Sequence, residues 1–263
     1  MKSYLAVLRG SFMIGLIYRY GFLFNIAGNI IYMLVTYYLW KSIYQGREVL
    51  RGLTFDQTYI YVALGSAVFI LLKTYVDWLL SFDIREGMIA SYLIKPIDLQ
   101  FYILFNSFGY SLMSLAAITL PTLILMIFVL HIEIPLGIGL ALFPLSLLLA
   151  YLVSFCFDYF VGLLCFYTES IWGLSITKEI IVTVLSGALI PLQFFPDTIQ
   201  KILFWLPFQA IYYTPLTMVA QPNLGMDTFL PMLGLQLFWV IVLFVFTRLF
   251  YNQAIKVLRI SGG

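Results

Sequence analysis

Charge is what this sequence has least of. Lysine, arginine, aspartate and glutamate make up 10% of its 263 residues, whereas 63% are hydrophobic; soluble domains carry about 25% charged residues. A water-soluble globule cannot hide that much apolar surface, because its exterior has to carry many charged side chains. The mean hydropathy of +1.01 therefore predicts a membrane protein. The net charge of +2 gives no indication of nucleic-acid binding.

Metal-ligating and nucleophilic residues are also scarce. The two cysteines, Cys156 and Cys165, lack the close spacing of a metal or redox site, and the single histidine, His131, cannot build a multi-histidine metal site alone. The sequence contains no phosphate-binding GxxxxGKS/T loop, no HExxH and no GxSxG. We therefore expect a non-enzymatic chain with no catalytic residue, cofactor or metal of its own.

Long apolar runs predict six transmembrane helices. One bilayer crossing takes about 20 apolar residues, and helices are the default because backbone in lipid must satisfy its own hydrogen bonds. The predicted fold class is an all-α polytopic membrane protein, with one transmembrane domain over residues 1–263. The six runs cover about residues 21–43, 57–81, 101–130, 136–167, 171–192 and 229–251.

The lysines and arginines outside these spans predict the orientation, because cytoplasmic loops carry an excess of them. With six spans both termini share one side. That side carries eight of these residues and the opposite side four, so we expect both termini in the cytoplasm. The first group is Lys2, Arg9, Arg19, Arg85, Lys95, Arg248, Lys256 and Arg259, and the second is Lys41, Arg47, Arg51 and Lys201.

The first 20 residues are apolar with sparse charge. Lys2 and Arg9 are seven positions apart and so share one face of a helix. This pattern favours a helix in the cytoplasmic interface, with its basic groups toward the lipid headgroups. A simple extension of the first span is the alternative.

The densest cluster of charge lies between the second and third spans, in residues 81–98. Ser81 or Asp83 can cap a short helix there, with Glu86 in the position of a capping box, and Pro96 marks its end. Its apolar stripe predicts that the helix lies on the membrane or docks into a groove of a soluble partner; a solvated loop is the alternative. The stripe consists of Ile84, Met88 and Tyr92, with Ile89 and Leu93 beside it.

Five prolines interrupt an apolar stretch after the fifth span. A proline inside a helix removes a hydrogen bond and costs about 3 kcal/mol or more, so one straight helix is implausible. We expect short re-entrant helices near the outer membrane face, over residues 193–222, that line or cover something. One of them should begin at Pro196 and carry a stripe of Ile199, Ile202, Leu203 and Leu206. The interrupting residues are Pro191, Pro196, Pro207, Pro215 and Pro222.

Ionisable residues at membrane depth cost about 2.5–3.5 kcal/mol each on insertion scales and are functional candidates by default. Lys73 and Asp77 are four positions apart and can pair on one helix face. Lys178 can pair with Asp158 or Glu169 on a neighbouring helix. The alternative is a polar patch on the path of a substrate. Six residues form this group: Lys73, Asp77, Asp158, Glu169, Lys178 and Glu179.

Two segments resemble the permease subunits of type-2 ATP-binding-cassette (ABC) transporters. More narrowly, they resemble a six-span branch often found as two different permeases beside one ATPase. The first segment, "DIREGMIASYLIKPID", follows the pattern R.G....LL.KP, and the second follows SG..IPL..FP...Q.....LPF......P. The matching residues are Arg85, Gly87, Leu93, Lys95 and Pro96 in the first, and Ser186, Gly187, Pro191, Leu192, Phe195, Pro196, Gln200, Leu206, Pro207, Phe208 and Pro215 in the second.

The resemblance implies a non-catalytic permease in a bacterial or archaeal cell membrane. It implies a homodimer or a heterodimer with a sister permease, on a dimer of ATPase subunits that bind ATP and magnesium. Residues 81–98 would carry the coupling helix that contacts the ATPase, residues 1–20 the connecting helix, and the broken segment a cap over the exit. The implied coupling residues are Asp83, Ile84, Arg85, Glu86, Gly87, Met88, Leu93, Lys95 and Pro96, and the implied outer gate is Pro191, Phe195, Pro196, Trp205, Pro207, Phe208 and Pro215.

Function is therefore expected to be ATP-driven export of a lipid-like or amphipathic cargo, since the outer segment is rich in aromatic residues and nearly uncharged. Import is the alternative direction. An ion-coupled secondary transporter or channel is the main rival, and inverted repeats with paired broken helices would support it. The sequence indicates one broken segment and no matching half. A membrane-embedded enzyme would need clustered catalytic groups, which one histidine and scattered carboxylates do not provide.

Overall fold

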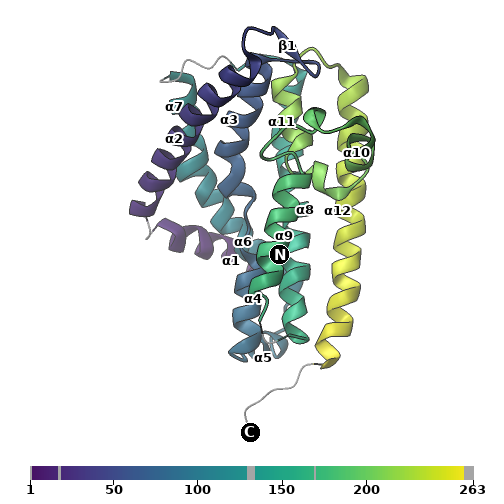
Figure 1. The fold of residues 1–263 in the computed structure, drawn as a ribbon. Helices are drawn as coiled ribbons and strands as arrows, with labels where there is room; N and C mark the ends of the chain where they lie inside the picture. The colour runs from purple at the N-terminus through teal and green to yellow at the C-terminus, as the bar shows by residue number, and fades with distance from the viewer. Residues whose placement is uncertain (1, 17–18, 129–133, 169, 258–263) are drawn as a thin grey trace.

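Long helices running side by side form the body of the molecule (Figure 1). The computed structural model describes residues 2–16, 19–128, 134–168 and 170–257. One end of the bundle carries a small β-hairpin, and the other carries the short helix α5 (Ile89–Leu93). We call these the hairpin end and the α5 end. His131, Glu169 and Arg259 lie outside the described residues.

Five helices in the described part of the chain are long and apolar enough to cross a membrane. They correspond to the first, second, third, fourth and sixth spans expected from the sequence. A mostly helical, multi-pass membrane protein is therefore confirmed. The five spans are Gly21–Tyr44, Phe55–Arg85, Leu99–Phe128, Ile138–Phe166 and Met226–Val257.

The helices within these spans are partly subdivided. The first lies in α2 (Arg19–Tyr44), the third consists of α6 (Leu99–Ser114), a π-helical turn at Leu115–Thr119 and α7 (Leu120–Phe128), and the fourth is α8 (Ile138–Leu163) with a 3-10 turn at Leu164–Phe166. The last is α12 (Met226–Ala254), followed by a 3-10 turn at Ile255–Val257.

Strands β1 (Val49–Leu50) and β2 (Leu53–Thr54) pair antiparallel as the hairpin, which the all-α prediction did not include.

The second span is not one helix. Helix α3 (Phe55–Leu72) begins with a capping box between Thr54 and Gln57 and ends at Lys73. Tyr75 then takes a left-handed φ of +54°, and α4 (Val76–Arg85) starts after it. Because left-handed backbone interrupts the i to i−4 hydrogen-bond ladder, the continuous helix expected over residues 57–81 is wrong.

The fifth expected span is shorter than predicted. Helix α9 (Trp172–Leu185) has 14 residues, which at 1.5 Å per residue cover about 21 Å, against a hydrocarbon core of about 30 Å. The chain leaves the helix at Gly187, which has a φ of +81°. A Cβ there would lie 2.7 Å from the Tyr61 hydroxyl. A helix reaching residue 192 is therefore wrong.

Short helices follow α9, as the prolines predicted. Helix α11 (Tyr213–Ala220) is buried along its whole length against α3 and α8, and a Cβ on Gly139 of α8 would lie 1.9 Å from the Met218 carbonyl oxygen. The apolar stripe predicted for α10 (Asp197–Leu203) is only partly packed against the protein: Leu203 is buried and Leu206 is half-buried, whereas Ile199 and Ile202 are exposed. The short elements are a 3-10 turn at Leu192–Phe194, α10 (Asp197–Leu203), a 3-10 turn at Pro207–Ala210 and α11 (Tyr213–Ala220).

Helix α1 (Lys2–Gly15) lies across the long helices and does not continue the line of α2 (Figure 1). It packs on α6, where a Cβ on Gly109 would lie 2.4 Å from the Leu8 carbonyl oxygen. At the start of α6 the backbone N–H of Asp98 donates a hydrogen bond of 2.9 Å to the Tyr4 hydroxyl. The alternative, a simple extension of the first span, is therefore wrong, and the position of α1 in a membrane interface stays a prediction.

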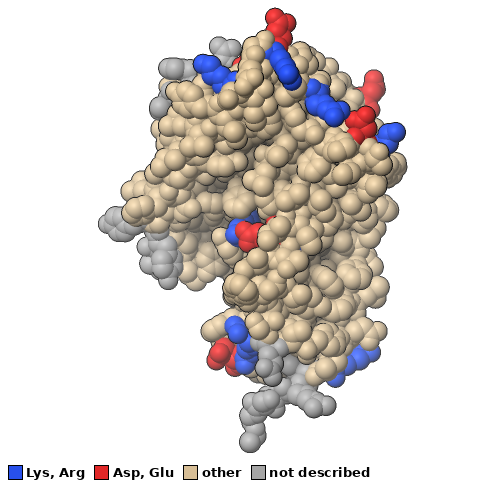
Figure 2. All heavy atoms as spheres, viewed as in Figure 1, with Lys and Arg blue, Asp and Glu red and all other residues tan. Residues whose placement is uncertain are grey.

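Charged side chains gather at the two ends of the face shown in Figure 2, with one small mixed group between them. The surface between the ends is almost free of charge in this view. That distribution is what a helical bundle needs to cross a bilayer, because charge inside the hydrocarbon region is costly.

The α1–α6 contact depends on Gly109. We expect Gly109→Ala to lower the free energy of unfolding by about 1–3 kcal/mol, the usual cost of overpacking, because the new methyl group meets backbone of α1. Thermal unfolding of the purified protein in detergent measures this. The matched control is Gly28→Ala in α2, where nothing lies within 4 Å of the new Cβ and helix propensity favours alanine by about 1 kcal/mol. Equal melting temperatures for both variants would contradict the close packing.

Candidate functional site

A cluster of ion pairs surrounds the break between α3 and α4. Lys178 of α9 pairs with Asp77 of α4, with Nζ 2.9 Å from Oδ2, and also with Asp158 of α8. The structure thus brings together Lys178 and Asp158, one of the two pairings expected from the sequence. Asp77 was not expected in this pair.

Lys73 does not pair with Asp77, and that expectation is wrong. Residues 73–75 are non-helical and α4 starts only at Val76, so Lys73 and Asp77 do not have the i, i+4 relation on which the expectation depended. Lys73 instead pairs with Glu179 of α9. The next residue, Thr74, donates a hydrogen bond of 2.5 Å from its hydroxyl to Asp158.

The cluster therefore fastens the break to two neighbouring helices. Asp77 and Asp158 are 1% and 7% exposed, and their partner Lys178 is largely buried as well. Removing one partner of a buried ion pair leaves an uncompensated charge, which costs about 3–5 kcal/mol. The ion pairs thus hold the start of α4 against α8 and α9.

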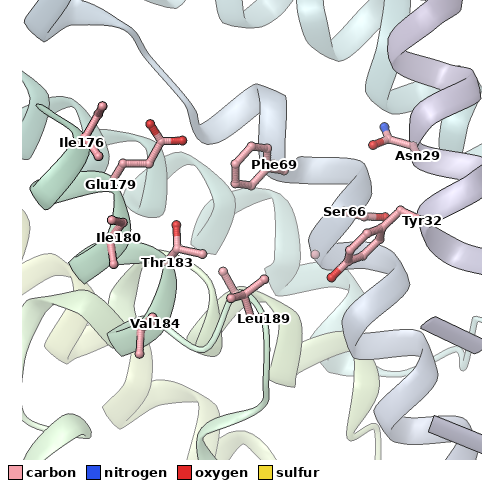
Figure 3. A pocket seen from close by; sticks show the side chains of 12 residues that line it. Asn29, Tyr32, Ser66, Phe69, Ile176, Glu179, Ile180, Thr183, Val184 and Leu189 are labelled. Atoms are coloured by element: carbon pink, nitrogen blue, oxygen red, sulfur yellow. The ribbon is translucent and has the colours of Figure 1, made fainter. Parts of the chain in front are cut away.

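A groove opens beside this cluster, between α2, α3, α9 and the turn that follows α9 (Figure 3). Its volume of about 510 Å³ is in the range of small-molecule sites, about 300–1,000 Å³. The wall is mostly apolar. Its polar side chains are Asn29, Tyr32, Ser66, Glu179 and Thr183.

The groove and the ion-pair cluster are contiguous. A smaller cavity of about 50 Å³ contains Lys73, Asp158, Lys178 and Glu179 and shares Glu179 with the groove, together with Phe69 and Thr183. Glu179 and Phe69 both extend into the space of the groove (Figure 3). A molecule bound in the groove would therefore meet one member of the ion-pair network directly.

The groove could not be predicted from the sequence. Its polar residues are isolated in the sequences of three different apolar helices, and nothing in their spacing indicates that they face one another. The one available signal was the set of ionisable residues at membrane depth.

The segment expected to couple to an ATPase lies at the α5 end. It is a helix end, a turn and a five-residue helix: α4 ends at Arg85, Gly87 turns the chain at a φ of +71°, and Leu93 is the last residue of α5. One helix starting at Ser81 or Asp83 is therefore wrong, because the chain is already helical from Val76.

The exposed side chains of this segment differ in part from the predicted stripe. Asp83 and Ile89 are buried, and Tyr92 and Ile84 are half-buried. Burial raises the pKa of the Tyr92 hydroxyl, with the nearby Asp83 carboxylate as a further cause. The exposed residues that the structure describes in this segment are instead Phe82, Arg85, Glu86, Gly87, Met88, Ser91, Ile94, Lys95 and Pro96. Phe82 and Ile94, 49% and 84% exposed, were missed because they lie off the predicted stripe.

The residues expected to form the outer gate lie in the short elements near the hairpin end. Hydrogen bonds hold this segment in place: the Tyr61 hydroxyl donates to the Gly187 carbonyl at 2.8 Å, and the Gln236 amide donates to the Ala210 carbonyl at 2.7 Å. An exposed ion pair of 3.2 Å joins Arg51 to Asp197 of α10. Of the expected gate residues, Pro191, Pro207 and Pro215 are buried, Phe195 and Phe208 are half-buried, and Pro196 and Trp205 are exposed.

A family model described as ABC-2 family transporter protein matches residues 30–262. The match includes the groove residues of α3 and α9, the whole ion-pair cluster, the α5 end and the short elements near the hairpin. No curated protein matches the chain at a significant level.

The ion-pair cluster depends on Lys178, which serves two carboxylates. We expect Lys178→Met to lower the free energy of unfolding by about 3–5 kcal/mol, because it leaves Asp77 and Asp158 buried without a cation. Thermal unfolding of the purified protein in detergent is the measurement. Combining Lys178→Met with Asp77→Asn and Asp158→Asn should recover most of the loss.

The matched control for Lys178→Met is Arg51→Met. Arg51 and Asp197 are exposed at the hairpin end, and exposed pairs contribute about 0–1 kcal/mol. A loss in Lys178→Met no larger than in Arg51→Met would show that the cluster does not hold the break in place.

Proposed function

The chain belongs to the ABC-2 family of transporter proteins, and on this basis we propose that it is the membrane-spanning permease subunit of an ATP-driven exporter. The observation that carries the proposal is the family match over residues 30–262. ATP and magnesium would be bound by separate ATPase subunits, and this chain would hydrolyse nothing. Two permeases, either two copies of this chain or this chain and a sister permease, would sit on an ATPase dimer.

The α5 end is the proposed contact with the ATPase. It presents three exposed apolar side chains, Phe82, Met88 and Ile94, among the charges of Arg85 and Glu86. Apolar anchors within a charged rim are the composition of protein interfaces. In this proposal the α5 end and both termini face the cytoplasm, and the hairpin end faces outward.

The break at residues 73–75 gives this contact a mechanical link to the groove. A push on α5 acts on α4, which is joined to α3 by three non-helical residues. The ion pairs of Lys178 and Lys73 connect this joint to α9, and α9 forms one wall of the groove. Hinges of this kind absorb a change of backbone angle in a few residues at the end of an element.

The groove is the proposed path of an amphipathic or lipid-like cargo. Its wall is mainly apolar with a few polar groups, and it lies between α2 and α3, which belong to two candidate membrane spans, and the shorter α9. The short elements near the hairpin end are proposed to cap the exit; in them Pro207 and Pro215 are buried and Trp205 is exposed.

The rival function is an ion-coupled secondary transporter or channel. One observation favours it: the second span is broken, with ionisable residues at the break, in addition to the broken segment that follows α9. Family membership favours the ATP-driven alternative. Transport by liposomes that contain this chain, an ion gradient and no ATPase would support the rival.

The proposed orientation can be tested by labelling single introduced cysteines. We expect Glu48→Cys near the hairpin to react with a membrane-impermeant maleimide in intact cells, and Glu86→Cys near α5 to react only after the cells are permeabilised. Both positions are exposed acidic residues, so the variants are matched. The native Cys156 and Cys165 are buried and provide the background in the unmodified chain. Labelling of Glu86→Cys in intact cells would overturn the orientation.

The proposed ATPase contact predicts a loss of association. Arg85→Ala combined with Met88→Ser should reduce co-purification of the ATPase by about tenfold or more, since interface anchors cost about 2 kcal/mol or more when truncated. The matched control is Arg51→Ala combined with Val49→Ser, which removes the same kinds of exposed side chain at the opposite end. Undiminished ATPase in the first variant, at equal expression, would remove the coupling role from this segment.

A further inference from the structure

The ammonium of Lys73 occupies a site that suits any organic cation. It pairs with the Glu179 carboxylate and lies 5.7 Å from the centre of the Phe69 ring and 5.0 Å from that of Tyr75. A carboxylate flanked by aromatic faces within about 6 Å is the usual environment in which proteins bind ammonium groups. Lys73 thus fills this site as an internal cation.

The same carboxylate faces the groove. Among the described residues that line the groove, Glu179 is the one that carries charge. Phe69 lines the groove as well, and both side chains extend into it (Figure 3). A cation entering the groove would therefore reach the carboxylate and one ring of the Lys73 site.

The ion-pair cluster also has one more carboxylate than it has ammonium groups. It contains three carboxylates, those of Asp77, Asp158 and Glu179, but only two ammonium groups, those of Lys73 and Lys178. Lys178 is shared between Asp77 and Asp158. A third cation would allow each carboxylate to have a partner of its own.

We propose that the groove binds a cationic amphiphile, an aliphatic chain with an ammonium head, whose head takes the place of Lys73 on Glu179 and Phe69. The aliphatic part would lie against the apolar wall near Ile180 and Val184. This inference rests on the proposed function, because it takes the groove to be the path of the cargo. An anionic head would meet Glu179 and find no lysine or arginine among the described lining residues.

The displaced Lys73 has a partner within reach. Lys73 and Asp158 line the same small cavity, and the neighbouring Thr74 already bonds to Asp158. Lys73 therefore moves to Asp158 while Lys178 stays on Asp77. Cargo binding thereby replaces the link between the break and Glu179 of α9 with a link to α8, so the hinge state depends on whether the groove is occupied.

The test is binding of radiolabelled dodecyltrimethylammonium to the purified full chain in phosphatidylcholine nanodiscs, corrected with empty nanodiscs. Competitors with the same chain length and different heads are dodecylammonium, uncharged dodecanol and anionic dodecanoate. We expect dodecylammonium to compete at least about tenfold better than the other two, a difference that corresponds to about 1.4 kcal/mol. Equal competition by dodecanol or dodecanoate would overturn the proposal.

Two substitutions should act in opposite directions. Glu179→Gln should weaken binding of the labelled cation by about tenfold or more, because it removes the charge that the head needs. Lys73→Met should strengthen it, because the internal competitor is gone. A purely structural role for the pair would weaken binding in both variants, and that result, or unchanged binding in Glu179→Gln, would overturn the proposal.

Two further variants keep the test decisive. If Lys73→Met does not fold, Phe69→Leu replaces it and should weaken binding of the cation while leaving dodecanol competition unchanged. Asp197→Asn, at the exposed pair near the hairpin, is the control and should change nothing. Because binding is measured without an ATPase, failure of the coupling proposal would leave this result intact, and failure of cation binding would leave co-purification of the ATPase intact.

Discussion

The cost of charge in an apolar environment is the constraint on which this structure depends. Asp77 and Asp158 are buried beside a non-helical stretch of backbone, and neither the charges nor the freed peptide groups are tolerated in lipid without partners. Lys178 supplies the partner for both carboxylates, and the hydroxyl of Thr74 adds a further bond. The break in the second span therefore lies at a position where side chains of α8 and α9 supply these partners.

This arrangement puts the most polar part of the interior at the junction of the proposed ATPase contact and the groove. Helices α4 and α5 lie on one side of it, and α9 and α3 form the groove beside it. The further proposal is that its ion pairs are exchanged among a small set of partners. Ion pairs that can be redistributed at little net cost allow two packings of similar free energy, which is the requirement for a two-state element. An apolar contact at the same place would fix one packing.

Much of the fold follows from the sequence, and particular residues show where inference from sequence stops. Hydropathy predicted the membrane class and most of the long helices, and the prolines from Pro191 to Pro222 predicted short helices in place of one. Nothing in the sequence around Tyr75 marks a break, since the run on both sides is apolar and contains no glycine or proline there. Lys73 and Asp77 therefore looked like a pair within one helix. The groove is a product of tertiary packing, because Asn29, Ser66 and Glu179 come from three helices.

The shortness of α9 has a consequence for the lipid around it. The apolar length of α9, about 21 Å, is shorter than that of the neighbouring spans and creates hydrophobic mismatch. A bilayer accommodates a short hydrophobic segment by thinning locally. Ile180 is 59% exposed and Trp172 is 62% exposed along this helix in the single chain, so lipid that reaches α9 meets the short wall. In the proposed transport function, a headgroup moving past α9 would cross a thinned bilayer, and its path through hydrocarbon would be shortest at the mouth of the groove.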